Sequence, residues 1–293
     1  MEARRNIMKN QIVNYAIDYI MKNRTSDINI DDVAEKCGYS KYYLERLFKA
    51  ETGESIYSFI KRIKVEQSAF ILKIEKDRTV TDVGAEYGYS SSNYATLFRN
   101  HFGMAPAAFR KNVQNSTLPL IDAEEMKRSI RIEHLQEYHV LFERHKSNYA
   151  HLPEDWCDFV VRNNDFVTPD TIFFDITYDD PQIVDENQCL YDICMTIPRD
   201  DPRLIRQKTA AVGITSRCNA REVPNTMIIP GGKFAVYRYK GYPQQIYPAY
   251  QSIFRNWLFE TGNHIDNRIG YDIYYSVDDD SLYMEMDICI PIK

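Results

Sequence analysis

The chain has 293 residues, of which 44% are hydrophobic and 27% are charged, and its formal net charge is −6 at pH 7. This composition is typical of folded globular domains, and the length suggests two of them, which excludes a disordered or fibrous chain. No apolar run approaches the roughly 18 residues of a membrane-spanning helix, and no apolar core follows the basic first residues, so we expect a cytoplasmic protein without a membrane segment or signal peptide.

The charge is distributed unevenly along the chain. Residues 1–115 contain 18 Lys and Arg against 14 Asp and Glu, a net charge of +4. Residues 116–293 contain 18 against 28, a net charge of −10. A basic first part on an acidic chain favours contact with a polyanion by that part alone.

The first predicted element is an amphipathic helix over residues 9–22, and an internal repeat follows it. Residues 30–61 align with residues 80–111 at a fixed offset of 50, and ten of these 32 positions are identical. Such a match without a gap indicates a duplicated structural unit. The identical pairs are Asp32/Asp82, Val33/Val83, Gly38/Gly88, Tyr39/Tyr89, Ser40/Ser90, Leu47/Leu97, Phe48/Phe98, Gly53/Gly103, Phe59/Phe109 and Lys61/Lys111.

Each copy predicts two short helices joined by a tight turn. In the first copy, Asn29 and Asp32 have the spacing of a helix N-cap and its acidic N3 partner. Gly38 is placed to end that helix, and Ser40 can cap the next one. Thr79, Asp82, Gly88 and Ser90 hold the same places in the second copy. Helix, glycine-containing turn, helix is the arrangement of a helix-turn-helix unit.

Residues 55–75 predict a long helix between the two units, and Pro106 suits the first position of a closing helix. The whole pattern, over roughly residues 8–112, resembles the DNA-binding domain of the AraC/XylS family of bacterial transcription regulators. The segments GYSKYYLERLFKAETG and GYSSSNYATLFRNHFGMAPAAFR carry the resemblance. The second unit departs from the family, which usually has one more residue between glycine and phenylalanine and a basic residue where Thr96 stands. We therefore expect altered readout of DNA sequence by the second unit.

The resemblance implies that the second helix of each unit enters the major groove of double-stranded DNA, with the two units in successive grooves about 34 Å apart. Arg46 has the chemistry for bidentate contact with guanine, Glu45 can accept from cytosine, and Asn93 can read adenine. Lysines at these helices, and Arg99, suit phosphates. The alternative is that these residues are only solvated helix faces. The predicted DNA contacts are Lys41, Tyr42, Glu45, Arg46, Lys49, Ser91, Ser92, Asn93, Thr96 and Arg99.

Residues 113–129 are polar, contain Pro119 and predict a linker between a domain at 1–112 and one at 130–293. Beyond it the pattern predicts strands separated by two helices. A weaker repeat aligns 140–146 with 234–240, 174–178 with 271–275 and 190–198 with 284–292. We therefore expect a multidomain chain in which the all-α double helix-turn-helix domain is followed by an α+β domain. Its antiparallel sheet should consist of two strand-helix-strand-strand halves related by a pseudo-twofold axis.

This second region resembles the GyrI-like, or SOUL-type, small-molecule-binding domain, with GGKFAVYRYKG and YMEMDICIPIK as its specific segments. The resemblance implies an effector pocket, in some members for lipophilic or cationic compounds. Alternation along 282–290 places apolar residues on one face of the sheet and acids on the other. To the acidic face we also assign Asp175, Asp272, Tyr237 and Tyr239. Carboxylates beside aromatic rings suit a cationic apolar ligand. The alternative is the wet face of an antiparallel sheet. The predicted effector residues are Glu285, Asp287, Asp192, Tyr237 and Tyr239.

These patterns predict a sequence-specific DNA-binding activator of transcription that is modulated by a small-molecule effector, with RNA polymerase as a further partner. The chain has no HExxH, GxSxG or phosphate-loop motif, its six cysteines form no CxxC pair, and its histidines lack ligand spacing. We therefore expect no enzyme activity, metal or cofactor, and reduced thiols. The alternatives are a GyrI-like small-molecule hydrolase or a drug-sequestering protein fused to a DNA-binding domain.

Overall fold

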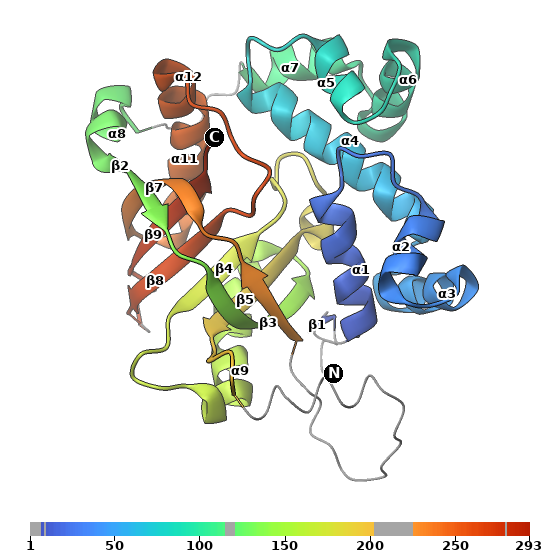
Figure 1. Cartoon of the computed structure of the whole chain (residues 1–293). Helices are drawn as coiled ribbons and strands as arrows, with labels where there is room; N and C mark the ends of the chain where they lie inside the picture. The colour runs from blue at the N-terminus through green and yellow to red at the C-terminus, as the bar shows by residue number, and fades with distance from the viewer. Residues whose placement is uncertain (1–6, 9, 115–120, 202–224, 279) are drawn as a thin grey trace.

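The computed structural model describes the chain except for residues 1–6, 9, 115–120, 202–224 and 279. Part of the predicted linker and one of the six cysteines, Cys218, therefore lie outside the described residues. Figure 1 shows a helical N-terminal part packed against a C-terminal part built around one sheet. No helix in the described ranges is long and apolar enough to cross a membrane. The described cysteines are free thiols, and no group of three or more His, Cys, Asp or Glu among the described residues has the arrangement of a metal site.

The helical part confirms the duplicated units and their predicted boundaries. Asn29 and Asp32 form a reciprocal capping box, and Gly38 follows the helix in the left-handed conformation, with φ of 74°. The side chains of Ser40 and Ser90 each accept a backbone N–H in the first turn of the second helix of their unit. The helices are α1 Gln11–Lys22, α2 Ile30–Cys37, α3 Lys41–Thr52, α4 Ile56–Ile74, α5 Val80–Glu86, α6 Ser91–Phe102 and α7 Pro106–Gln114.

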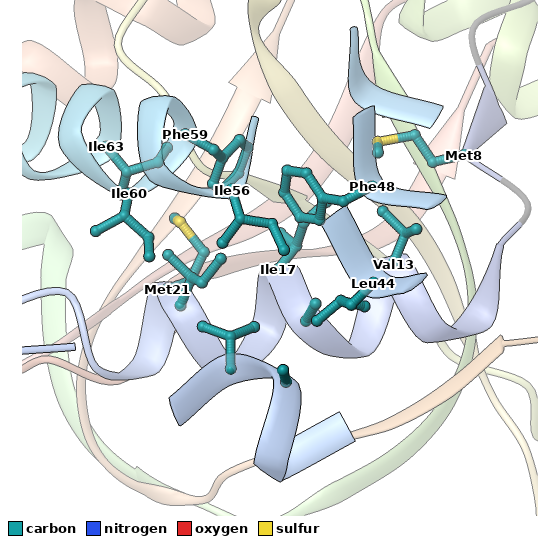
Figure 2. Packing of buried hydrophobic residues seen from close by; sticks show 14 of the residues in the cluster. Met8, Val13, Ile17, Met21, Leu44, Phe48, Ile56, Phe59, Ile60 and Ile63 are labelled. Atoms are coloured by element: carbon teal, nitrogen blue, oxygen red, sulfur yellow. The ribbon is translucent and has the colours of Figure 1, made fainter. Parts of the chain in front are cut away.

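Helix α4 belongs to the cores of both units. Figure 2 shows Ile17 of α1, Phe48 of α3 and Phe59 of α4 in the first core, where the two phenylalanine rings lie 5.2 Å apart in an edge-to-face arrangement. Further along α4, Val65 and Leu72 are buried with the residues of the second unit. One rigid helix therefore fixes the position of each unit relative to the other.

The second unit has a smaller residue than the first at one core position and a larger residue at another. The first unit has Ala34 and Leu44 where the second has Gly84 and Tyr94. A Cβ on Gly84 would lie only 2.7 Å from the ring of Tyr94, which is buried and donates its hydroxyl to Ser68 Oγ at 2.9 Å. Glycine is needed at this position because the tyrosine ring occupies the space of its side chain.

The C-terminal part confirms the two strand-helix-strand-strand halves. Its described antiparallel sheet has the order β1-β3-β5-β4-β8-β9-β7-β2, and β6 also pairs with β3. The halves β3-α9-β4-β5 and β7-α11-β8-β9 meet where β4 pairs with β8. The strands are β1 Ile7–Met8, β2 Ile130–Leu135, β3 Tyr138–Lys146, β4 Phe173–Thr177, β5 Leu190–Thr196, β6 Asn225–Ile229, β7 Gly232–Gly241, β8 Tyr271–Val277 and β9 Met284–Pro291, and the helices are α9 Leu152–Asn163, α11 Pro243–Ser252, the π-helix η4 Ile253–Trp257 and α12 Leu258–Thr261.

The second half of the expected linker is a helix. Asp122 caps α8 (Ala123–Ser129), and Met126 is fully buried in the same cluster as Trp257 and Leu258 of the C-terminal part. A methionine within a polar run is enough to anchor this segment, because burying one apolar side chain contributes about 1.5–3 kcal/mol.

Both faces of the sheet carry buried apolar clusters, so the alternative of a wet face on an antiparallel sheet does not hold. On the helix side, Met286 and Ile288 pack against α11 and η4. The opposite side carries a second buried apolar cluster that includes Phe174, Phe234 and Ile273. The acids on that side lie at its two ends, where ion pairs hold them.

The two parts of the chain pack against each other along several elements. Strand β1 adds to the edge of the sheet beside β3. Leu190 of β5 is buried in the core of the first helix-turn-helix unit, and Ile183 and Val184 are buried in the core of the second. The segment between β4 and β5 therefore docks on the helical domain.

Candidate functional site

The predicted DNA-reading helices present open polar faces. Helices α3 and α6 begin at Lys41 and Ser91, and nine of the ten predicted contacts are exposed, all but Glu45. In Figure 1 both helices lie on the side of the molecule away from the sheet. Nothing in the described structure therefore buries these faces inside the protein.

Arg46 is exposed and packs over an aromatic neighbour. Its guanidinium lies 5.7 Å from the ring centroid of Tyr43, which stacks on Tyr39 at 5.2 Å. A cation–π contact at an exposed site contributes about 0.5–1 kcal/mol and restricts the arginine rotamers. Tyr42 is 80% exposed beside it. Lys41 pairs with Asp31 at 3.2 Å, a surface ion pair weak enough to be exchanged for a phosphate.

Glu45 differs from its predicted role. It is half-buried, and its Oε2 accepts the backbone N–H of Ile56 at 3.2 Å. This carboxylate satisfies an otherwise free N–H group at the start of α4 and complements the positive end of the helix. Glu45 therefore stabilises the junction of α3 and α4 through one of its carboxylate oxygens.

Helix α6 presents a less charged surface than α3. Ser92, Asn93 and Arg99 are exposed, whereas Thr96 donates its hydroxyl to the carbonyl oxygen of Ser92 at 3.0 Å. Thr96 therefore uses its hydroxyl donor within the helix.

Asp287 and Glu285 are occupied by cationic side chains. Arg238 donates to Asp287 Oδ1 at 2.6 Å and to Glu285 Oε1 at 2.7 Å, while Tyr275 donates to Asp287 Oδ2 at 2.8 Å. Burial alone would raise the pKa of Asp287, but the hydrogen bonds from Arg238 and Tyr275 lower it below its ordinary value. Both acids are therefore paired with a cationic side chain within the protein, and their predicted role in effector binding stays a prediction.

Asp192 holds the equivalent place in the first half of the sheet and is fully buried. Arg144 donates to its two carboxylate oxygens, each at 2.7 Å, and Tyr178 donates to Oδ2 at 2.6 Å. Arg144 also pairs with Asp18 of α1 at 2.7 Å and donates to the carbonyl oxygen of Asn14 at 3.2 Å. Asp192 is therefore linked through Arg144 to α1 of the helical domain, and its predicted role as an effector residue stays a prediction.

Tyr237 and Tyr239 lie on the opposite face of the sheet from these acids. Tyr237 pairs with Ile288 and Tyr239 with Met286, and directly paired residues point to the same face. That face packs against the helices, where Tyr239 donates to the carbonyl oxygen of Tyr242 at 2.6 Å. The five predicted effector residues therefore form no single cluster.

The structure contains a different acidic centre, on the helix side of the sheet. Asp175 of β4 and Asp272 of β8 are cross-strand partners where the two halves meet. Tyr274 donates to Asp175 at 2.7 Å, and Tyr250 of α11 donates to Asp272 at 2.6 Å. Both acids line a cavity of about 1800 Å³ that lies against α9, α11 and the sheet.

Burial keeps a proton on this acid pair. It raises the pKa of Asp175 to about 6, and it raises that of Asp272 well above the ordinary value, to which the charge of Asp175 adds. Two adjacent carboxyls in a low-dielectric site cannot both ionise, so the pair retains a proton at neutral pH. A bound cation would favour the fully ionised form.

The cavity wall also contains polar atoms and aromatic rings suited to a ligand. Trp156 lies 5.4 Å from Tyr274, ring to ring, and its indole N–H has no hydrogen-bond partner among the described residues. Gln251 is 1% exposed, and its Oε1 likewise lacks a partner in the described ranges. Buried polar groups of this kind are normally satisfied, so these two are suited to bind a ligand or ordered water.

The sequence contained a signal for this pair. The weaker repeat aligns residues 174–178 with 271–275, which makes Asp175 and Asp272 equivalent. Equivalent residues meet when they lie on the two strands next to a twofold axis, and β4 and β8 are those strands.

Comparison with known proteins agrees with this architecture. Residues 128–293 match the family described as the GyrI-like small molecule binding domain, and residues 33–112 match a helix-turn-helix domain family. The probable transcription factor PqrA of Proteus vulgaris is 33% identical over 115 residues, which are 38% of this chain and 91% of PqrA. The multiple antibiotic resistance protein MarA of Escherichia coli is 35% identical over 95 residues, 32% of this chain and 74% of MarA. In a cryo-electron-microscopy structure of an EcmrR–DNA complex, the matched EcmrR chain is 10% identical in sequence, with a TM-score of 0.43. The match covers 87% of this chain and 85% of the EcmrR chain.

Proposed function

Because the chain belongs to the AraC-type transcription regulators and has a GyrI-like small-molecule-binding domain, we propose that it is a sequence-specific activator controlled by a lipophilic cation bound beside Asp175 and Asp272. The acid pair within an aromatic-lined cavity is the observation that supports this effector class. The cation would compensate a carboxylate charge that is otherwise costly to bury. Trp156, Tyr250 and Tyr274 would contact its apolar parts.

The size of the cavity favours a bulky ligand. Typical ligand pockets have volumes of roughly 300–1000 Å³. The cavity at about 1800 Å³ exceeds that range, and its accessible surface is mostly apolar although charged side chains also line it. A cation with several aromatic rings fits this combination better than a small polar metabolite.

Tetraphenylphosphonium, with neutral triphenylphosphine oxide as its control, tests the effector class by calorimetric titration of the full chain. We expect Asp272→Asn to weaken tetraphenylphosphonium binding by about tenfold or more, because the cation loses a carboxylate partner in a buried site. Asp287→Asn is the matched control, since Arg238 already holds that acid outside the cavity lining. Equal affinity of the wild type for both probes, or loss of binding in Asp287→Asn alone, would refute the assignment.

Selection of bound duplexes from random sequence, with and without tetraphenylphosphonium, tests the DNA-binding part of the proposal. A bipartite selected site, with two short elements about one helical turn apart, is the expected result. Transcription from that site by purified RNA polymerase then tests activation and the proposed polymerase contact. A chain that enriches no sequence would contradict the proposal.

The acid pair also favours a second candidate function. A protonated and an ionised carboxyl side by side can act as general acid and base, as a small-molecule hydrolase would require. Turnover of p-nitrophenyl acetate by the full chain that Asp272→Asn abolishes would support the hydrolase. Binding of tetraphenylphosphonium without any effect on transcription would instead support a sequestering protein.

A further inference from the structure

We propose that the cavity is a composite site in which helix α4 of the DNA-binding domain forms one wall, so that a ligand bound beside the acid pair contacts that domain directly. This inference rests on the proposed function, because it concerns the same cavity. It adds a ligand-contacting surface on the DNA-binding domain and a physical route from effector to DNA.

The lining of the cavity crosses the domain boundary. Glu66, Gln67 and Phe70 of α4 line it, together with Asp18 and Met21 of α1. The other walls come from α9, α11 and the strands that carry the acid pair. A ligand large enough to use this volume therefore meets side chains of both domains.

A continuous series of contacts links the acid pair to α4. Tyr250, which donates to Asp272, packs against Phe254 of η4 with ring centroids 5.9 Å apart. Phe254 packs edge-to-face against Phe70 of α4 at 5.3 Å. A ligand that displaces Phe254 therefore moves a ring that is in direct contact with Phe70.

Polar contacts hold α4 in place on either side of Phe70. Lys73, almost fully buried, donates to Asp180 at 2.6 Å and to the hydroxyl of Tyr247 on α11 at 2.8 Å. Gln67 donates to the carbonyl oxygen of Tyr178 at 3.3 Å. These bonds fix the wall relative to the cavity, so the position of α4 depends on α11 and on the segment after β4.

The helix that makes these contacts has an irregular backbone. Pro248 lies inside α11, and the chain continues as the π-helix η4. Proline removes one backbone donor, and π-helical turns are found frequently at functional sites because they can change register at low cost. Tyr247, Tyr250 and Phe254 all lie on this irregular stretch.

Movement of α4 affects both DNA-reading helices. Phe59 of α4 packs in the core of the first unit, and Leu72 packs in the core of the second. A ligand that contacts α4 therefore changes the free energy of the arrangement in which α3 and α6 read DNA. Ligand and DNA affinities must then change each other by the same factor.

The test uses the full chain, tetraphenylphosphonium and the duplex obtained by selection. Phe70→Leu removes the ring from the wall, and Phe70→Trp fills part of the cavity while keeping an apolar contact. We expect both variants to weaken tetraphenylphosphonium about fivefold or more in calorimetric titrations. Phe102→Leu is the matched control, a half-buried phenylalanine of the same domain that does not line the cavity, and it should bind the probe like the wild type.

Fluorescence anisotropy of the labelled duplex gives the second readout. Saturating tetraphenylphosphonium should change the DNA dissociation constant of the wild type at least about fivefold, and this change should be lost in the Phe70 variants. If both variants bind the probe as the wild type does, or if the wild-type DNA affinity is unaffected by the probe, the composite site is refuted while the proposed effector class survives. If the wild type binds no probe, the proposed function and this inference both fail.

Discussion

Arg144→Met is the substitution that most directly tests how the two domains are held together. Arg144 is fully buried between the sheet and α1, and it contacts Asp192, Asp18 and the main chain of Asn14. Methionine has a similar length and no charge, so it preserves packing while it removes every one of these contacts.

The expected loss follows from the burial of the partners that remain. Asp192 is also completely buried and would be left without a cation, and breaking a buried pair by removing one partner costs about 3–5 kcal/mol. Arg238→Met is a matched control, because Arg238 holds the equivalent position in the second half of the sheet. Its side chain is 35% exposed, and Asp287 keeps Arg131 and Tyr275 as partners, so we expect a loss of about 1 kcal/mol or less.

Urea denaturation of the full chain, followed by circular dichroism and by tyrosine and tryptophan fluorescence, measures both losses. The Arg144→Met transition should also separate into two steps, because this arginine joins the helical domain to the sheet. Equal losses for the two variants, or a loss below about 1 kcal/mol for Arg144→Met, would show that burial of this ion pair does not govern the stability of the interface.

Four further outcomes follow from the structure. Arg46→Ala should weaken binding to the selected duplex by about 1–3 kcal/mol and relax one base position in a repeated selection, whereas an unchanged sequence preference would exclude a base contact. Gly84→Ala should lower the free energy of unfolding in urea by about 1–3 kcal/mol, because the new Cβ would lie 2.7 Å from the ring of Tyr94. Adding Tyr94→Leu should recover part of that loss, since the first unit combines alanine with leucine at these positions. Burial raises the pKa of Asp179 to about 7, so between about pH 4 and pH 7 the folded state binds a proton that the unfolded state has lost, and stability should fall as the pH rises through this range. Asp179→Asn should flatten that profile, and a slope that persists in the variant would show that other groups cause it. Since burial raises the pKa of Asp175 to about 6, the affinity for tetraphenylphosphonium should rise as the pH rises through about 6, and a flat profile would place the cation elsewhere.

The helical domain could be predicted from the sequence because its determinants are local. Asn29, Gly38 and Ser40 act within a few residues of their own positions, and the structure confirms each of them as a cap or turn residue. The apolar spacing of the second helices placed nine of the ten predicted contacts on exposed faces. Glu45 could not be assigned in this way, because its partner lies in the following helix and a periodicity argument contains no information on such a contact.

The sheet was harder to predict because its faces depend on register. Alternation along β9 correctly separated Met286 and Ile288 from Glu285 and Asp287. To assign the residues of a neighbouring strand to the same two faces, the pairing register must be known, because a slip of one residue exchanges the faces. Tyr237 and Tyr239 were assigned to the wrong face for this reason. The pairing of Arg238 with Asp287 is likewise a property of the register and not of either strand alone.

The duplication within the sheet explains why similar residues have different roles. Arg144, Asp192 and Tyr178 in the first half correspond to Arg238, Asp287 and Tyr275 in the second, and both sets form the same ion pair and tyrosine hydrogen bond. Helix α1 covers the first set, so its ion pair holds the two domains together. In the second set Asp287 is buried, but Arg238 is 35% exposed and Tyr275 is 53% exposed, so the ion pair is partly open to solvent and contributes less. At the axis, where β4 meets β8, the two halves bring equivalent acids together, and the effector chemistry proposed for this protein depends on that symmetric contact.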